Sequence, residues 1–201
     1  KDILHVDFLE QKLAFLAIPK TGTSAYAQAL APVASLSLQD PPELKHAPLI
    51  RYNRFIRPMY EIVCNTQLDT MAVIREPISW MGSWYRYRQR PFLKGKPTST
   101  QDITFDTFAR GYLQATPPAY AHIGSQARFI TPRAGTPPVT YLFRYENQSR
   151  LRDFLEHRLE TKILIPRHNA SAQTPLHLSA SVEQEVIEKY QADFDLWHSL
   201  G

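Results

Sequence analysis

The sequence predicts an α/β fold of three layers, in which helices flank a central parallel sheet. Two short apolar runs, 12–18 (KLAFLAI) and 70–74 (TMAVI), support this prediction. Uninterrupted runs of this length are typical of strands that are covered on both faces. Each run is followed by a turn and a helix-like segment, and alternating strands and helices are typical of a parallel sheet. With 201 residues, we expect a single domain over 1–201.

The remaining elements follow from apolar spacing and from proline. Helices are expected over 25–30, 51–62 with a break near Pro58, 77–90, 105–114 and 149–159, and around the apolar positions Val182, Val186, Tyr190, Phe194 and Trp197. Pro77 suits the first position of its helix. Further strands are expected over 139–143 (VTYLF) and 162–165, and residues 33–50 are Pro-rich and irregular.

Composition excludes several classes of protein. No apolar run approaches the roughly 20 residues that a membrane span needs, and the first residues lack the apolar core of a signal peptide. The only cysteine, Cys64, cannot form an intrachain disulfide, and this favours a reducing compartment, so we expect a cytoplasmic location. The net charge of +4 suits an anionic partner or cofactor.

The first candidate site follows the first apolar run, in PKTGTS (19–24). A glycine-containing loop between a strand and a helix binds anions, because unpaired amides and the positive end of the helix dipole face the ligand. Gly22 permits close backbone approach, and Lys20 adds a positive charge. Three residues add hydroxyl groups: Thr21, Thr23 and Ser24. Ser24 is also a candidate helix cap. An ordinary strand–helix turn is the alternative.

The second candidate site begins at the end of the second apolar run. Arg75 stands there, and Ser83 follows on the expected helix. Arginine offers a planar set of donors that suits phosphate, and open α/β sheets bind ligands at the carboxyl ends of their strands. Residues 51–96 carry nine Lys or Arg against three acids, which fits an anion site as well as a solvated basic face. The alternative for Arg75 is a structural ion pair with Glu76 or Glu146.

Together these motifs resemble those of sulfotransferases that use 3′-phosphoadenosine-5′-phosphosulfate (PAPS). The family's P-K-x-G-T-[ST] loop is matched by Pro19, Lys20, Gly22, Thr23 and Ser24. Its second motif is matched by Arg75, Pro77, Ser83 and Tyr85, with Glu76 where many members have Asp or Asn. Weaker likenesses to the bacterial and Golgi carbohydrate sulfotransferases are 45–47 (KHA), Gln126, 143–147 (FRYEN), 168–171 (HNAS) and 193–197 (DFDLW).

The resemblance implies a P-loop-like fold and a metal-independent O-sulfotransferase. It would move a sulfuryl group from PAPS to a hydroxyl on a carbohydrate or another hydroxyl compound, leaving 3′-phosphoadenosine-5′-phosphate (PAP). By resemblance, Lys20 steadies the leaving phosphate, the amides of 21–24 hold the 5′-phosphate, and Arg75 and Ser83 hold the 3′-phosphate.

The resemblance also implies a general base. His46, in the KHA element, is the candidate, with Glu43 as a second choice, because a hydroxyl acceptor must lose a proton. An inert loop histidine is the alternative for His46. Asn169 and Ser171 are expected to line the cofactor or acceptor site, with loop bracing as the alternative.

Two other functions remain open. A P-loop kinase or nucleotide hydrolase would require ATP and magnesium, but the loop lacks the first glycine of G-x-x-x-x-G-K-[ST]. A basic nucleic-acid-binding module would use residues 84–96 (WYRYRQRPFLKGK) to stack bases, although the segment lacks the signatures of common nucleic-acid-binding domains. We expect no nucleic acid partner, and the sequence does not indicate an oligomeric state.

Overall fold

The computed structural model describes residues 5–38, 40–165 and 176–200. Contacts between these residues divide the chain into two compact units. The first unit consists of the described residues 5–38, 40–75, 126–165 and 200, and the second consists of 76–125 and 176–199. The single domain expected over 1–201 stays a prediction.

The first unit is built around a five-stranded sheet with the strand order β3-β1-β2-β4-β5. The strands are β1 His5–Phe8, β2 Leu13–Leu16, β3 Leu36–Leu38, β4 Asp69–Ile74 and β5 Tyr141–Arg144. Strands β2, β4 and β5 are parallel, whereas β1 is antiparallel to both β2 and β3. The α/β class is confirmed, but the prediction of a purely parallel sheet is wrong. Only residues 9–12 join β1 to β2, and so short a connection returns the chain antiparallel.

The predicted strands differ in outcome. The two apolar runs form β2 and β4, and every residue of β2 is buried. Strand β5 begins two residues later than predicted, after Pro137 and Pro138, which have no N–H to donate to a ladder. The strand expected over 162–165 is absent from the described sheet. Instead, the N–H of Ile163 donates to Oε1 of Glu156 at 3.0 Å, and the Ile163 side chain packs into the core.

Strand β1 was not predicted, because polar His5 and Asp7 occupy two of its four positions. Both side chains are fully buried, and Nε2 of His5 lies 3.0 Å from Oδ1 of Asp7, although neither of these two atoms makes a well-formed hydrogen bond. The hydroxyl of Tyr60 donates to Oδ2 of Asp7 at 2.9 Å. The bond from Tyr60 satisfies Oδ2 of Asp7, and the close approach of His5 to Asp7 offsets part of the cost of burying their other polar atoms.

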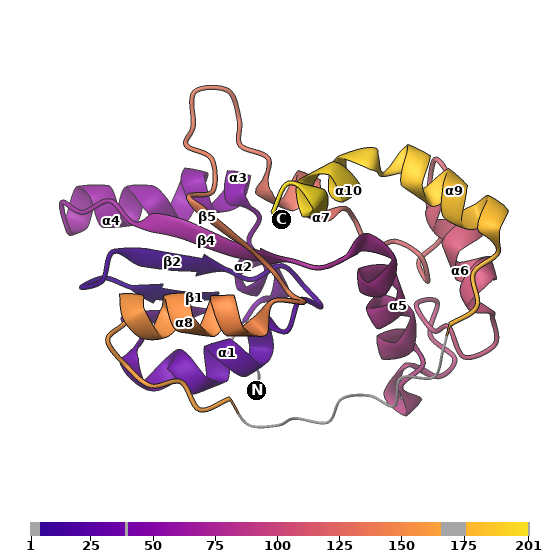
Figure 1. The fold of residues 1–201 in the computed structure, drawn as a ribbon, viewed down its shortest axis with the longest axis horizontal. Helices are drawn as coiled ribbons and strands as arrows, with labels where there is room; N and C mark the ends of the chain where they lie inside the picture. The colour runs from indigo at the N-terminus through magenta and orange to yellow at the C-terminus, as the bar shows by residue number, and fades with distance from the viewer. Residues whose placement is uncertain (1–4, 39, 166–175, 201) are drawn as a thin grey trace. The chain divides into compact units, whose positions relative to one another are not determined.

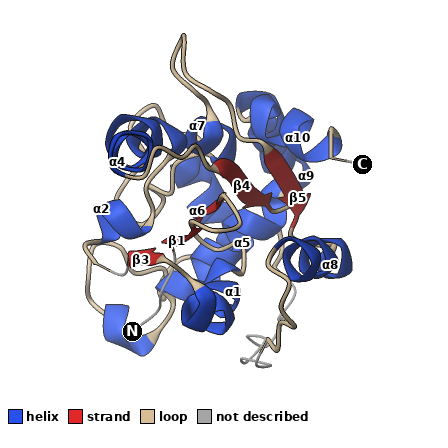
Figure 2. Ribbon diagram, turned by 90° about the vertical axis from the view of Figure 1, so that its left-hand side faces the viewer, coloured by secondary structure: helices blue, strands red, loops and turns tan. Residues whose placement is uncertain are grey.

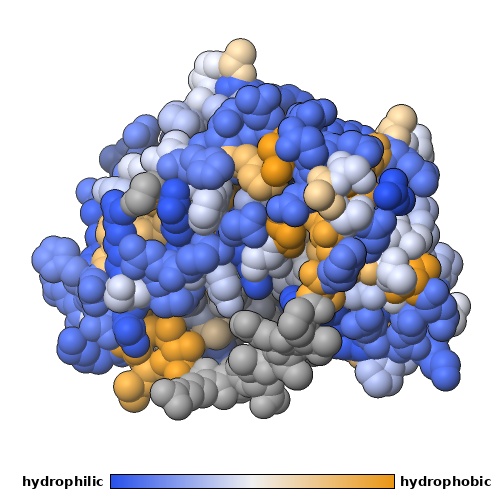
Figure 3. Space-filling view, turned by 45° about the vertical axis from the view of Figure 1, so that its right-hand side comes forward, coloured by the Kyte–Doolittle hydropathy of each residue, from blue (hydrophilic) through white to orange (hydrophobic). Residues whose placement is uncertain are grey.

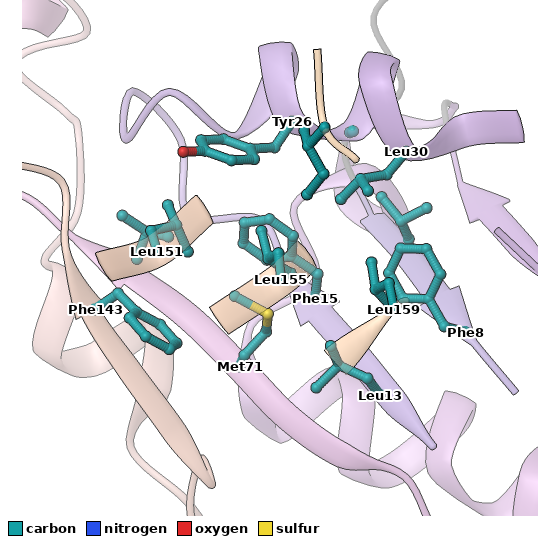
Figure 4. Close-up of a cluster of buried hydrophobic side chains, with 14 residues drawn as sticks. Phe8, Leu13, Phe15, Tyr26, Leu30, Met71, Phe143, Leu151, Leu155 and Leu159 are labelled. Atoms are coloured by element: carbon teal, nitrogen blue, oxygen red, sulfur yellow. The ribbon is translucent and has the colours of Figure 1, made fainter. Parts of the chain in front are cut away.

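Helices cover both faces of this sheet (Figures 1 and 2). On one face lie α1 Thr23–Leu30 and α8 Gln148–Arg158, whose apolar side chains meet those of the strands in the core drawn in Figure 4. On the other face lie α3 Leu49–Arg51, a π-helical turn over Tyr52–Ile56 and α4 Arg57–Val63. The break expected near Pro58 is not at that residue, because Pro58 is the second residue of α4; the irregular part of the segment is the π-helical turn before it.

Short elements complete the first unit. They are η1 Ala31–Val33, α2 Pro42–Lys45 and α7 Gln126–Ile130. Residues 33–50 are therefore less irregular than expected, because they contain β3, α2 and the start of α3.

The second unit is helical. Its elements are α5 Pro77–Arg88, η3 Pro91–Leu93, α6 Phe105–Tyr112, α9 Ala180–Lys189 and α10 Gln191–His198. Pro77 is the first residue of α5, as predicted. The last predicted helix is two helices that meet at Tyr190, whose ring stacks on Tyr112 with centroids 4.1 Å apart. The apolar core of the second unit includes the side chains of Met81, Phe108 and Val186.

Hydrophilic side chains cover most of the face drawn in Figure 3, and apolar side chains appear in small separate areas. This mixture is ordinary for a protein surface. Within the described residues, we find no helix with the length and apolar character that a membrane crossing requires.

Candidate functional site

Three segments that follow parallel strands meet at one edge of the sheet. Residues 17–22 follow β2, Arg75 follows β4 and Tyr145 follows β5. The N–H of Tyr145 donates to the carbonyl oxygen of Ile74 at 2.7 Å, which holds the last two segments together. Ligands of open α/β sheets bind at this edge, where the strands end.

The loop between β2 and α1 is held in shape from within. Lys20 (φ 68°) and Gly22 (φ 76°) both adopt the left-handed conformation. The hydroxyls of Thr21 and Thr23 are buried and donate to the carbonyl oxygen of Ile18, at 2.9 and 3.4 Å. Each hydroxyl has a single proton and directs it to Ile18. These threonines therefore brace the loop, and what they offer to an anion is their backbone amides.

Helix α1 begins directly after the loop, with Gly22 as its N-cap. Its first amides have no acceptor inside the helix and lie at the positive end of the helix dipole. No described side chain caps this end, and Thr23 is already helical, so the prediction that Ser24 caps the helix is wrong. A Cβ on Gly22 would lie 2.9 Å from Cε2 of Tyr145, so only glycine fits between the loop and this ring.

The guanidinium group of Arg75 is held beside this loop. Its Nη1–H donates to the carbonyl oxygen of Lys20 at 3.3 Å, and its Cζ lies 4.5 Å from the centroid of the Tyr145 ring. A guanidinium stacked on an aromatic ring keeps its N–H groups in a plane suited to phosphate oxygens. The structure therefore brings Lys20 and Arg75 together, although 55 residues separate them in the sequence.

Gln126, the first residue of α7, holds the backbone of Arg75. Its Oε1 accepts from the N–H of Arg75 at 2.9 Å, and its Nε2 donates to the carbonyl oxygen of Arg75 at 2.8 Å. A backbone N–H only donates and a carbonyl only accepts, so this pair fixes the orientation of the amide. The Gln126 side chain is fully buried. The sequence indicates Gln126 through the family likeness alone, because nothing local marks a glutamine as buried.

His46 contacts the segment that leads into the loop. It ends α2, and its Nδ1 lies 2.9 Å from the carbonyl oxygen of Ala17. Because that oxygen can only accept, Nδ1 carries the proton and Nε2 is the proton acceptor of the neutral ring. Burial lowers the pKa of His46 below its ordinary value of 6.5, the bond to Ala17 partly opposes this, and the charge of Lys45 lowers the pKa further. At neutral pH the imidazole is therefore uncharged and able to act as a base.

Other expected site residues lie elsewhere. Ser83 lies on α5 in the second unit, so its approach to Arg75 stays a prediction. Glu43 is exposed on α2. Asn169 and Ser171 lie outside the described residues.

The carboxylate of Glu76 caps α5. It accepts from the backbone N–H groups of Ile78 and Ser79 at 3.0 and 2.6 Å. A carboxylate at a helix N-terminus stabilises the helix, and aspartate or asparagine would serve equally. The departure at Glu76 from the family pattern thus leaves the capping function in place.

The segment 84–96 contributes side chains to the interior of the second unit. Tyr85 is buried, and its hydroxyl donates to the carbonyl oxygen of Ile103 at 2.7 Å. Arg88 is only 7% exposed and donates to two backbone carbonyl oxygens at 2.9 and 3.0 Å. The alternation of arginine and aromatic residues is thus partly a packing pattern.

Across the described ranges, no three His, Cys, Asp or Glu side chains gather closely enough to hold a metal ion.

Comparison of the chain with protein-family models, with curated proteins and with solved structures gave no match. The interpretation of this edge of the sheet as an anion site depends on its residues and their geometry.

Proposed function

We propose that the protein is a PAPS-dependent O-sulfotransferase. The observation that supports this most is the meeting of the two motifs, since the Arg75 guanidinium bonds to the carbonyl of Lys20 within the anion-binding loop. The Arg75 guanidinium, a loop that contains Lys20 and a helix N-terminus lie at this one edge, and they suit a ligand that carries more than one anionic group.

The residues present fit a nucleotide of this kind. Gly22 is exposed, and the amides of residues 21–24 lie in the loop and in the uncapped first turn of α1, where a phosphate oxygen would bind. Lys20 would hold the oxygen that links sulfate to the 5′-phosphate, and Arg75 would hold the 3′-phosphate. The part that the family resemblance gives to Ser83, which lies in the second unit, stays a prediction. Bound PAPS would supply an activated sulfuryl group with the 5′-phosphate as its leaving group.

Catalysis by this chain consists of positioning, charge and one proton transfer. Lys20 stabilises the negative charge that develops on the leaving oxygen, because a fixed cation acts most strongly where charge appears. His46 accepts the proton of the acceptor hydroxyl at Nε2, while the carbonyl of Ala17 holds the proton on Nδ1.

The acceptor class, a carbohydrate or another hydroxyl compound, rests on the family likeness. The cytoplasmic location stays a prediction from the single cysteine.

Specific observations weigh against the alternatives. The loop places Lys20 before the glycine, which is the reverse of the magnesium-nucleotide P-loop. Burial of Tyr85 and Arg88 removes two of the side chains that a nucleic-acid-binding module over 84–96 would use.

The proposal is tested by incubating the protein with PAPS and a panel of hydroxyl compounds in EDTA. Mass spectrometry should find sulfated acceptor and PAP in equal amounts, and Lys20→Ala should form neither. Phosphoryl transfer from ATP with magnesium, and none of the sulfuryl transfer from PAPS, would contradict the proposal and favour a kinase.

A further inference from the structure

We propose that Gln126 is a positioning residue that sets the selectivity of this site for a 3′-phosphate, by fixing the backbone from which the Arg75 side chain extends. The inference rests on the proposed function, because it assigns the 3′-phosphate of PAPS to Arg75. It adds a residue whose two side-chain hydrogen bonds both go to the backbone of Arg75.

Arg75 needs such support because it lies one residue beyond the end of β4. The last residue of the strand, Ile74, pairs with β5 in the sheet, and its carbonyl accepts from Tyr145. At Arg75 the two backbone bonds of Gln126, at 2.9 and 2.8 Å, take the place of a neighbouring strand. The side chain thus leaves a backbone that is fixed at both its N–H and its C=O.

Burial makes this support hard to replace. Gln126 is 0% exposed, so water does not readily take over its bonds when the amide is removed. The guanidinium must also meet two fixed partners, the Lys20 carbonyl at 3.3 Å and the Tyr145 ring at 4.5 Å. A backbone shift of about 1 Å at Arg75 would break this alignment. Misplacement of about 1 Å can lower the rate of a reaction by about 100-fold.

The test compares two nucleotides that differ only in the 3′-phosphate. Calorimetric titration in EDTA gives the Kd of PAP and of adenosine 5′-monophosphate for wild type and for Gln126→Met, which keeps the size of the side chain but loses both bonds. The ratio of the two Kd values is the selectivity, and Gln126→Met should lower it by roughly 10- to 100-fold, the usual range for a hydrogen bond to a charged group. Gln126→Met should weaken the binding of adenosine 5′-monophosphate only slightly.

Tyr60→Phe is the matched control, because it removes a buried hydrogen bond in the same unit without touching Arg75. Tyr60→Phe should lower stability and leave the ratio of the two Kd values unchanged. If Gln126 only stabilised the fold, Gln126→Met would give the same result. Where Gln126→Met does not fold, Gln126→Asn keeps an uncharged amide but is shorter by one methylene group, so the amide cannot reach the Arg75 N–H and C=O in the same geometry.

The outcomes separate the two claims. A wild type that prefers PAP, with the same preference retained in Gln126→Met or Gln126→Asn, overturns the role of Gln126 alone. A wild type with no preference for PAP overturns both that role and the proposed function.

Discussion

Replacing Gly22 by alanine should destabilise the first unit and weaken anion binding for two separable reasons. The residue has φ 76°, a conformation that costs a residue with a Cβ about 1–2 kcal/mol. The new Cβ would lie 2.9 Å from Cε2 of Tyr145, so the ring must move. Overpacking of this kind costs about 1–3 kcal/mol. The two effects together lower the free energy of unfolding by roughly 2–5 kcal/mol.

Gly135→Ala is a matched control, because Gly135 has the same φ of 76° but nothing within 4 Å of its added Cβ. Urea unfolding followed by circular dichroism should show a loss of about 1–2 kcal/mol for Gly135→Ala and a larger loss for Gly22→Ala. Calorimetry should show weaker PAP binding in Gly22→Ala alone. Equal losses in the two variants, with equal PAP binding, would refute the role assigned to the Tyr145 contact.

Four further predictions concern the remaining site residues. Lys20→Ala should abolish sulfuryl transfer in a turnover assay, because its charge acts on the leaving group, and near-normal kcat would rule this out. Arg75→Ala should weaken PAP far more than adenosine 5′-monophosphate in calorimetry; equal losses would remove Arg75 from the 3′-phosphate. Thr21→Val should cost about 1 kcal/mol of stability in urea unfolding, the usual effect of one lost hydrogen bond, and no loss would exclude its bracing role. Because burial lowers the pKa of His46 below 6.5, kcat should fall on acidification as Nε2 binds a proton, with the midpoint of the fall below pH 6.5; a midpoint above pH 6.5 contradicts this.

The same pKa of His46 affects stability. The folded protein holds this proton less tightly than the unfolded chain does, so the unfolded state binds more protons below pH 6.5. The contribution of His46 to the free energy of unfolding should therefore be complete above pH 6.5 and decline as the pH falls. Urea unfolding of His46→Gln at several pH values should show a weaker decline than wild type, and an identical decline would contradict the assignment.

The fold could be predicted where hydrophobicity alone determines a strand. Strand β2 is apolar throughout, and β4 is apolar and buried from Met71 to Ile74, so the positions of both strands follow from the sequence. Strand β1 contains His5 and Asp7, whose burial depends on their pairing with each other and with Tyr60, and no local pattern encodes such a contact. Strand β1 is antiparallel to β2 because the connection over 9–12 is short. That length is known only once β1 itself has been located.

The candidate site could be predicted in part for a similar reason. Lys20 and Arg75 follow two parallel strands, so their meeting at one edge of the sheet follows from the strand assignment. The support of Arg75 by Gln126 and Tyr145 depends on chain segments that converge only in three dimensions. The hydrogen bond that sets the tautomer of His46 is likewise a tertiary contact, made to Ala17.

The most direct test of the central claim is calorimetric titration of the wild-type chain with PAP in EDTA, beside a titration with ATP and magnesium. The proposed sulfotransferase should bind PAP at micromolar Kd without metal and bind ATP with magnesium far more weakly. Binding of ATP with magnesium alone, or of neither nucleotide, would contradict the claim.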